Sequence, residues 1–484
     1  NKSLPDHHVG IQFGVSSPGI CGSTIVHENG TVLGMHVAGN SDGVGSAIVW
    51  SDKIRHDIHK ILAQDTKYIM DIPISTKTLS NFSGIKLDVD AHIQTPKSTN
   101  FIPSPISGVF PVSREPANLS KFGPHTVKDI EKKSFATVSS IPSEEIKFAK
   151  QVIEDYIADF DDLSSKEVIK GTSKLAPLNP DSSNGFGCLA EKSQYVNFEE
   201  GTYTELGAAE LERIEQSFDN GDIAIKDLVW FSTLKDELRS KTKEGKPRSF
   251  RVSPLFIQLL TKKYFGKMVE HIIAHKHFSG IMVGMNPFGE WPQVYENLKQ
   301  CNGVWAGDIG NYDGNMLPQV QQLVSEVLLN HYKGKHKMAA TFLLQNLSTT
   351  LVAINDDTYL TTHSLPSGSF LTAIFNSLVN KAYTAMWFHR NVDSKFHHSS
   401  YFHKEVVDYV YGDDKLNGVR SSKFPTLNAV TMKEFFEDLG MTFTDAAKKP
   451  IVEEYQTLDE VSFLKRKFVF HPLLGKVVCP LDKD

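Results

Sequence analysis

Two pairs of carboxylates in this sequence have the spacing of a metal-dependent site. Asp308 and Asp313 lie in GDIGNYDG, directly after an apolar stretch, and the adjacent acids Asp413 and Asp414 end the apolar run VVDYVYGDD far downstream. Side-by-side carboxylates repel one another, so a bound cation is the physical reason to keep them there. If Asp308 and Asp413 end neighbouring strands, they can hold two divalent ions about 3.5–4 Å apart, the arrangement that serves phosphoryl transfer. A solvated acidic turn is the alternative for the Asp-Asp pair alone.

A basic segment could supply the cations that a nucleotide's phosphates need. The stretch KDELRSKTKEGKPRSFR carries seven lysines and arginines against three acids, a net charge of +4. Arginine offers bidentate geometry to phosphate and lysine a point charge. In isolation, a solvated helix face is the alternative. The basic residues are Lys235, Arg239, Lys241, Lys243, Lys246, Arg248 and Arg251.

A third segment, PSGSFLTAIFN, has the pattern of a flexible loop that leads into a helix. Ser367 and Gly368 precede the helix start, and Asn376 falls in its second turn. Glycine allows a close backbone approach, and a helix start favours anions. The motif is weak when taken alone.

The elements that must position these residues follow from hydrophobic spacing. Apolar residues at helical spacing predict helices over 144–157, 255–275, 371–386 and 426–439, and shorter apolar runs predict strands over 304–309, 406–411 and 463–470. Short strands separated by turn residues are expected over 9–15, 23–26, 31–38 and 45–49. Scattered prolines between 71 and 124 leave no room for a long helix or a central strand. The expected fold class is α+β, with an antiparallel sheet backed by helices.

Composition limits the classes of protein that this chain can belong to. Its 484 residues predict roughly three domains, and 40% hydrophobic and 22% charged residues are typical of a globular chain. No apolar stretch reaches the roughly 18 residues that a transmembrane segment needs. Four widely spaced cysteines exclude a disulfide framework and predict a reducing compartment. The net charge of −6 requires that any nucleic-acid contact be local, and the start at Asn1 favours a processed product or a fragment.

Taken in order, these segments resemble the RNA-dependent RNA polymerases of picorna-like viruses, in the order Picornavirales. The resemblance spans about Asp181 to Leu481. It implies the fingers and palm of a right-hand polymerase, with Asp308 and Asp413 as the main metal ligands and Asp414 as an accessory ligand. The implied cofactor is a pair of Mg²⁺ ions, for which Mn²⁺ can substitute. The Ser/Pro arm with IPSPISG is most similar to dicistrovirus and iflavirus lineages.

The same resemblance assigns roles to the remaining motif residues. Lys448 is the implied general acid for the pyrophosphate leaving group, and Asp313 is the implied reader of the ribose. The residues implied to grip the triphosphate are Lys235, Arg239, Lys243 and Arg248, and those implied to recognise the 2′-hydroxyl and place the template are Ser367, Gly368, Thr372 and Asn376. The implied primer grip is Phe463, Leu464, Lys465 and Arg466. The implied template-entry loop contains Ser182, Ser183 and Gly185.

The amino-terminal piece has a resemblance of its own. GICG and GMHVAG resemble the end of the chymotrypsin-like cysteine proteases that precede these polymerases in polyproteins. Cys21 is the implied nucleophile and His36 the implied reader of a substrate glutamine. The general base and its acid are expected upstream of Asn1. We therefore expect an incomplete all-β protease barrel over 1–60, a junction over 61–95, and polymerase fingers and palm over 96–484, with most of the thumb missing because only 18 residues follow Arg466.

The predicted function is replication of a positive-strand RNA genome by two-metal nucleotidyl transfer. Expected partners are an RNA template and primer, nucleoside triphosphates, a protein primer and other viral replication proteins. The expected location is the host cell cytoplasm, at membrane-associated replication complexes. Two alternatives remain open: a reverse transcriptase-like polymerase, which the Asp313 and Asn376 combination disfavours, and a non-catalytic RNA-binding protease-polymerase precursor.

Overall fold

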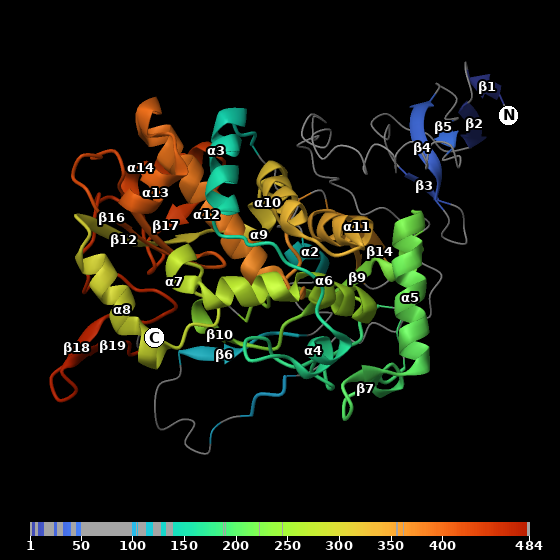
Figure 1. The fold of residues 1–484 in the computed structure, drawn as a ribbon, viewed down its shortest axis with the longest axis horizontal. Coiled ribbons are helices and arrows are strands. Elements are labelled where there is room, and N and C mark those ends of the chain that lie inside the picture. Colours follow the sequence, from blue (N-terminus) through green and yellow to red (C-terminus); the bar gives the residue numbers. More distant parts are fainter. Residues whose placement is uncertain are drawn as a thin grey trace.

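The structure is a computed structural model of the 484-residue chain. It describes the backbone of five strands within residues 2–49, and then residues 99–102, 104, 113–119, 127–131 and 139–481 except 187, 189, 222, 244, 355, 356 and 362. Helices and short sheets are mixed along the chain (Figure 1), which confirms the α+β class. None of the helices in the described residues is long and apolar enough to cross a membrane.

A four-stranded antiparallel sheet carries both acidic motifs. Its strands are β15 (Val406–Tyr411), β16 (Asp414–Val419), β12 (Gly303–Ile309) and β17 (Phe443–Thr444), in that spatial order. β15 and β16 form a tight hairpin, and β12 inserts between β16 and β17. β12 and β15 were predicted as strands over 304–309 and 406–411, and both are confirmed within one residue.

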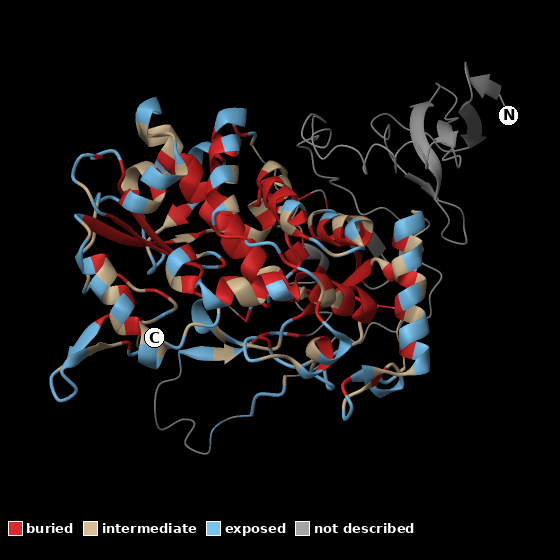
Figure 2. Ribbon diagram, viewed as in Figure 1, coloured by how far each residue is buried: buried red, intermediate tan, exposed pale blue. Residues whose placement is uncertain are grey.

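Alternation along the strands sends side chains to two different cores. Val406 and Val410 pack with the helices on one face, whereas Val407 and Tyr409 pack on the other face with α8 (Pro287–Lys299). This period of two buries both faces of the sheet. Buried residues accordingly run through the middle of the molecule in Figure 2.

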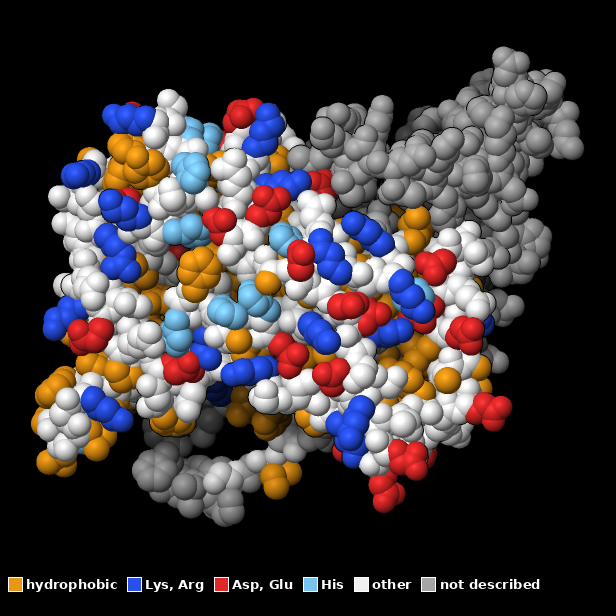
Figure 3. Space-filling model, viewed as in Figure 1, with side chains coloured by type: hydrophobic (Ala, Val, Ile, Leu, Met, Phe, Trp, Pro, Cys, Tyr) orange, Lys and Arg blue, Asp and Glu red, His pale blue; other side chains and the backbone are white. Residues whose placement is uncertain are grey.

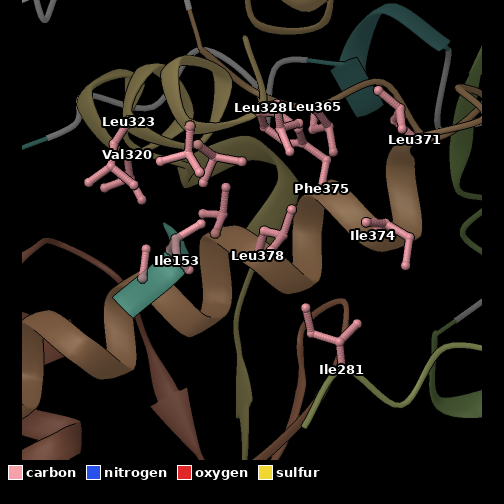
Figure 4. Packing of buried hydrophobic residues seen from close by; sticks show 14 of the residues in the cluster. Ile153, Ile281, Val320, Leu323, Leu328, Leu365, Leu371, Ile374, Phe375 and Leu378 are labelled. Atoms are coloured by element: carbon pink, nitrogen blue, oxygen red, sulfur yellow. The ribbon is translucent and has the colours of Figure 1, made fainter. Parts of the chain in front are cut away.

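The helix α12 (Thr372–Asn391) is the centre of the larger core. It packs against α3 (Ser143–Glu154), α10 (Pro318–His331) and β15. Figure 4 shows Phe375 and Leu378 of α12 on the side that faces Leu328 of α10. Because α12 is surrounded on nearly all sides, 15 of its residues are buried. A helix held this firmly is a rigid support for the residues at its ends and along its polar face.

A second sheet lies in another part of the chain. Its order is β11 (Ser249–Val252), β9 (Val229–Leu234), β13 (Leu351–Ile354) and β14 (Asp357–Leu360), with β9 and β13 parallel. Helices α5 (Glu205–Asn220), α6 (Leu255–Ala274) and α11 (Lys337–Ser348) pack beside one another. The small elements here are β6 (Arg114–Pro116), which pairs with β10 (Leu238–Ser240), the β7 (Val196–Asn197) and β8 (Thr202–Tyr203) pair, α2 (Val127–Glu131) and α4 (Ser165–Lys170).

The remaining described elements are short. They are α7 (Lys276–Ser279), α9 (Tyr312–Asn315), α13 (Ser399–Glu405), α14 (Ala429–Asp438), and the hairpin of β18 (Val469–His471) and β19 (Lys476–Val478). In Figure 3, charges of both signs are interspersed over this face, and hydrophobic side chains gather at the tip of the β18–β19 hairpin. There Phe470 and Leu473 are exposed.

The amino-terminal strands form an antiparallel sheet. They are β1 (Lys2–Leu4), β2 (His8–Phe13), β3 (Thr24–Val26), β4 (Val32–Gly39) and β5 (Gly45–Val49), in the order β1-β2-β5-β4-β3. The four strands expected in this region are therefore confirmed within two residues. The junction at 61–95 lies outside the described residues, and the incomplete barrel and missing thumb stay predictions.

One predicted strand is wrong. Residues 463–470 do not form a continuous strand, because the chain reverses at Leu464 and Lys465. The backbone N–H of Phe463 and of Arg466 each donate to the other's carbonyl, at 3.0 and 2.9 Å. Leu464 and Lys465 both have a positive φ, of 52° and 57°, as a two-residue hairpin turn requires. Neither residue type signals such a turn, so the apolar run reads as a strand.

Candidate active site

Strand pairing brings the two acidic motifs together. Asp308 and Asp414 are directly opposed partners across β12 and β16, and Asp413 stands beside them in the β15–β16 turn. Gly412, the other residue of this turn, has a φ of 64°, which glycine adopts without steric cost. Three carboxylates therefore gather where two neighbouring strands meet, as the sequence predicted on the condition that these strands pair.

The surroundings of these carboxylates disfavour their negative charge. Burial among protein atoms, together with the carboxylates of Asp414, Asp308 and Asp313, raises the pKa of Asp413 to about 6, although its surface stays accessible to solvent. Burial, with Asp308 nearby, also raises the pKa of Asp414. Like charges held close together disfavour ionisation of each group. The cluster is therefore a place where an added cation would gain free energy.

Two lysines lie against this cluster. The ammonium of Lys448 forms an ion pair with the Asp308 carboxylate, and its backbone is left-handed, with a φ of 65°. Lys448 and Lys465 both oppose the upward shift in the pKa of Asp414. Lys465 belongs to the 463–466 turn, so this turn faces the carboxylates. Lys448 and the predicted primer-grip segment are thus both at the site.

The donor set fits a hard divalent cation. Carboxylate oxygens are preferred Mg²⁺ ligands, and protein sites commonly offer one or two carboxylates and leave the other positions to water and substrate phosphates. Within the described ranges, no three His, Cys, Asp or Glu side chains form a ready-made metal site. The ammonium of Lys448 already stands in for a cation on Asp308. Asp308 and Asp413 would hold the ion, with Asp414 beside them.

A cavity of about 530 Å³ lies between β11 and the loop that precedes α12. It collects residues from three separate sequence motifs, because Lys235 and Arg248 of the basic segment, Asp313 and Ser367 all line it. Figure 1 shows how far apart in sequence the contributing elements are, from α2 to the start of α12. Its other lining residues are Glu131, Leu234, Asp236, Ser249, Phe250, Arg251, Ser364 and Leu365. Arg251 and Glu131 pair with each other. The cations Lys235 and Arg248, together with the Asp313 carboxylate, suit a phosphorylated sugar.

Asp313 lines this cavity and is bonded to Asn376. Asn376 Nδ2 donates to Asp313 Oδ1 at 3.0 Å. Asn376 Oδ1 is buried and has no hydrogen-bond partner among the described residues. Its backbone carbonyl accepts from the Tyr312 hydroxyl at 2.8 Å, which fixes the helix beside α9. An orphaned acceptor next to a carboxylate is a binding position for a hydroxyl group.

The loop before α12 is bonded to strand β11. Gly368 bridges to Val252, and a Cβ added at Gly368 would lie 2.0 Å from the Arg251 carbonyl oxygen. Thr372 Oγ1 donates to the Pro366 carbonyl at 2.7 Å and so closes the loop on itself. Glycine is therefore required here for a close backbone approach, which was one of the two reasons given for it from sequence. The other reason, anion binding at the helix start, stays a prediction.

The basic segment is partly neutralised by its own acid. Glu237 accepts from Arg248 at 2.8 and 2.5 Å and forms an ion pair with Arg239 at 3.5 Å. The net charge of +4 read from sequence already counts Glu237, and this pairing engages Arg239 and Arg248 within the segment itself. Lys235 lines the cavity and is exposed. Lys243 lies in a short 3₁₀ turn, and its side chain is outside the described residues.

The predicted template-entry loop is ordered by a lysine. Lys192 Nζ donates to the hydroxyl of Ser182 at 2.6 Å and to its carbonyl at 2.8 Å, and the N–H of Gly185 donates to Ser183 Oγ at 3.1 Å. The carbonyl of Asn184 accepts from the N–H of Leu255, which fixes the loop to the start of α6. Its contact with RNA stays a prediction.

The side chains of the two predicted protease residues lie outside the described part of the structure. Cys21 lies outside the described residues. His36 is in β4, but its side chain also lies outside the described part. Their catalytic and substrate-binding roles stay predictions.

Sequence reasoning missed a set of buried charges behind the site. Asp408 forms ion pairs with Lys381 at 3.1 Å and Lys415 at 3.0 Å, and all three are almost fully buried. Burial lowers the pKa of Lys415 to about 8 and also lowers the pKa of Lys381. An acid inside the apolar run VVDYVY was the available signal, but its partners lie on a different helix and strand.

Comparison with known proteins agrees with this geometry. The sequence model of the viral RNA-dependent RNA polymerase family matches residues 115–482. A solved Sicinivirus 3Dpol RNA-dependent RNA polymerase has the same fold, with a TM-score of 0.71 and 23% identity over 84% of this chain and 85% of that one. The chain is 30% identical over 302 residues to the replicase polyprotein of Cricket paralysis virus, covering 58% of this chain and 17% of that polyprotein.

The comparison extends toward the amino terminus as well. The genome polyprotein of human hepatitis A virus genotype IA is 25% identical over 486 residues, which cover 94% of this chain and 20% of that protein. The chain thus spans about a fifth of the length of the curated relatives it matches. An antiparallel palm sheet with paired acidic motifs defines a template-dependent polymerase. This chain belongs to the viral RNA-dependent RNA polymerase family, in its picorna-like group.

Proposed function

We propose that this chain catalyses RNA-templated RNA synthesis by joining a primer 3′-oxygen to the α-phosphate of a nucleoside triphosphate. The observation that carries this proposal is the pairing of Asp308 with Asp414 beside Asp413, next to a cavity lined by Lys235 and Arg248. The carboxylates mark where a reacting phosphate is held, and the cations mark where its charge is balanced.

Different residues of the site have different proposed roles. Lys235 and Arg248, on the fingers wall, bind and orient the triphosphate. Lys448, already at the Asp308 carboxylate, is placed to donate a proton from Nζ to the leaving pyrophosphate. The 463–466 turn faces the carboxylates and supports the primer end.

Divalent cations, with Mg²⁺ as the first choice and Mn²⁺ as a substitute, are part of this proposal. Asp308 and Asp413 would hold them, with Asp414 as an accessory. When bound, two such ions supply charge stabilisation to the entering and leaving oxygens.

Ribose selection is proposed for Asp313 and Asn376. The unpartnered Oδ1 of Asn376 would accept from a 2′-hydroxyl, and a deoxyribose would leave this buried acceptor unsatisfied. A site built to bond a hydroxyl rejects the analogue that lacks it. This pair supports an RNA polymerase over the reverse transcriptase-like alternative.

The test is incorporation of ribonucleotides and deoxyribonucleotides on a primed RNA template. We expect ribonucleotide incorporation that Asp308→Asn reduces at least 100-fold, while Asp459→Asn, at an exposed position outside the site, leaves it unchanged. Activity within threefold of wild type in Asp308→Asn would remove this residue from the site. Preference for deoxyribonucleotides would favour reverse transcription, and RNA binding without incorporation would favour a non-catalytic precursor.

The wider setting is also a proposal. The partners are an RNA template and primer, nucleoside triphosphates, a protein primer and other viral replication proteins, at membrane-associated complexes in the host cell cytoplasm. Fractionation of infected cells with an antibody to this chain tests the location. The chain should be recovered with membranes, and recovery elsewhere would contradict it.

We also propose a protease-derived segment over 1–60 and a junction over 61–95, followed by polymerase fingers and palm over 96–484. The antiparallel order of β1–β5 supports an all-β origin for the first segment. Cys21 would be its nucleophile, and His36 would line the pocket for glutamine. Cleavage of a glutamine-containing peptide by the protease-polymerase precursor, lost in Cys21→Ala, tests this role.

A further inference from the structure

The helix α12 carries a polar stripe along a face that is entirely inside the protein. Ser377, Asn380, Lys381 and Thr384 follow the i, i+3, i+4, i+7 spacing of one helix face. Their exposed fractions are 0%, 0%, 3% and 0%. A buried helix face normally carries apolar residues, so four polar groups in a row need partners.

The first two residues of the stripe hold the turn that precedes Asp413. Ser377 Oγ accepts from the backbone N–H of Gly412 at 2.9 Å. Asn380 Nδ2 donates to the backbone carbonyl of Gly412 at 2.8 Å. Both backbone groups of Gly412 are therefore bonded to the same helix, which fixes the position and direction of the turn.

The last two residues hold the strands of the hairpin. Lys381 Nζ donates to the Asp408 backbone carbonyl at 2.7 Å and lies 3.1 Å from its carboxylate. Lys415 bonds to Thr384 and lies 3.0 Å from the other Asp408 oxygen, which also accepts from Asn417 Nδ2 at 2.8 Å. The stripe thus forms hydrogen bonds with the hairpin both at its turn and along its two strands.

This network contains two lysines and one carboxylate. Lys381 and Lys415 face one carboxylate, so an excess positive charge is buried behind the turn. Lys381 also lies over the ring of Tyr156, 5.3 Å from its centre, which spreads part of this charge. Buried ion pairs contribute little to stability compared with apolar residues of similar volume. Their use here is better explained by the fixed geometry that such bonds impose.

The same helix also carries the ribose side of the site. Asn376, adjacent to Ser377, bonds to Asp313 at 3.0 Å. One rigid element therefore holds the proposed ribose pocket at its first turns and the proposed metal-binding turn along its polar face.

We propose that the stripe Ser377, Asn380, Lys381 and Thr384, with Asp408 and Lys415, is a positioning network that holds the Gly412–Asp413 turn in register with Asp308. The inference rests on the proposed function, because it assigns the network to the same site. None of the six residues needs to touch substrate. Loosening the network shifts Asp413 relative to Asp308, so it weakens cation binding before it weakens nucleotide binding.

The experiment compares Ser377→Ala and Asn380→Ala with matched controls. Ser325→Ala removes a hydroxyl that makes the same bond to a carbonyl four residues back, in α10, and Asn346→Ala removes a buried amide in α11. Neither control residue has a described hydrogen bond to the hairpin. We measure the Mg²⁺ concentration for half-maximal incorporation, the KM for nucleotide, and Mn²⁺ binding by electron paramagnetic resonance without substrate.

We expect the Mg²⁺ midpoint and the Mn²⁺ dissociation constant to rise about fivefold in each stripe variant, the factor that corresponds to roughly 1 kcal/mol for one lost hydrogen bond. The KM for nucleotide should change less than twofold, and the controls should match wild type. Unchanged metal midpoints in folded stripe variants, or an equal rise in the controls, would overturn the inference.

The buried charges give a second comparison. Asp408→Asn leaves two lysines without a carboxylate, and we expect the Mg²⁺ midpoint to rise more than tenfold. Adding Lys381→Met restores a single excess charge and should recover most of that loss. No recovery in a folded double variant would contradict a role for charge pairing. Ser377→Ala decides the question if the charge variants do not fold.

Failure of this inference is distinguishable from failure of the proposed function. An active wild-type protein whose stripe variants behave like the controls refutes only the positioning network. A wild-type protein without incorporation refutes the activity, and the Mn²⁺ measurement then still decides whether the stripe positions the turn.

Discussion

Replacing Asp413 by asparagine should make the metal-free protein more stable at neutral pH while it abolishes activity. In the folded chain, burial and the neighbouring carboxylates raise the pKa of Asp413 from 3.8 to about 6. The folded chain therefore binds this proton more tightly than the unfolded chain. By linkage, the free energy of unfolding falls as pH rises from about 4 to about 6 and stays lowered above that range.

The magnitude follows from the size of the shift. Roughly two pKa units at 1.36 kcal/mol each give about 3 kcal/mol at most. Asp413 is accessible to solvent, so screening reduces this to about 1.5 kcal/mol. An asparagine carries no charge and avoids the whole cost at pH 7.5. The melting temperature of the variant should rise by about 1–2 °C, because a chain of this length has a large entropy of unfolding.

The assay is thermal unfolding in EDTA at pH 7.5 and at pH 4, with Asp459→Asn as the control at an exposed position. Most of the gain should be gone at pH 4, where the wild-type carboxyl is protonated in the folded chain. Adding Mg²⁺ should then stabilise wild type and not the variant, because only wild type keeps the full ligand set. A variant less stable than wild type at pH 7.5, or equally stabilised at both pH values, would refute the reasoning.

Three other outcomes follow from the site. Lys448→Met should lower kcat about 100-fold with little change in nucleotide KM, and a kcat within threefold of wild type would exclude it as the acid. Asn376→Ala, which leaves Asp313 without its amide partner, should lower the ribonucleotide to deoxyribonucleotide ratio at least tenfold in competition assays, and an unchanged ratio would return us to the reverse-transcriptase alternative. Gly368→Ala should push the loop away from the Arg251 carbonyl and cost about 1–3 kcal/mol in thermal unfolding, whereas a neutral substitution would show that the contact is loose.

Local pattern was sufficient for the elements with a clear period. The helix expected over 371–386 is found over Thr372–Asn391, and the strand expected over 406–411 is found at those residues. The failure at 463–470 has a local cause, because Leu464 and Lys465 adopt a left-handed turn that their residue types disfavour. The paired backbone bonds between Phe463 and Arg466 close this turn.

The site was predictable where one motif carried its own chemistry. The adjacent Asp413 and Asp414 implied a cation, and Asp308 was their natural partner. The network around Asp408 was not predictable, because Lys381 and Lys415 look like ordinary surface lysines in a single sequence. Their burial depends on how α12 packs on the hairpin, which is a property of the whole fold.

The order of strands in the palm sheet has a consequence for how the protein is made. β12 receives both of its neighbours from far downstream, since Asp413 follows Asp308 by 105 residues and β17 comes later still. On the ribosome, β12 therefore emerges with both edges unpaired and with apolar side chains such as Trp305 uncovered. Such non-local pairing is slow and favours chaperone binding until residue 444, the end of β17, has been synthesised. A chain interrupted before β16 consequently lacks the assembled carboxylates of Asp308, Asp413 and Asp414.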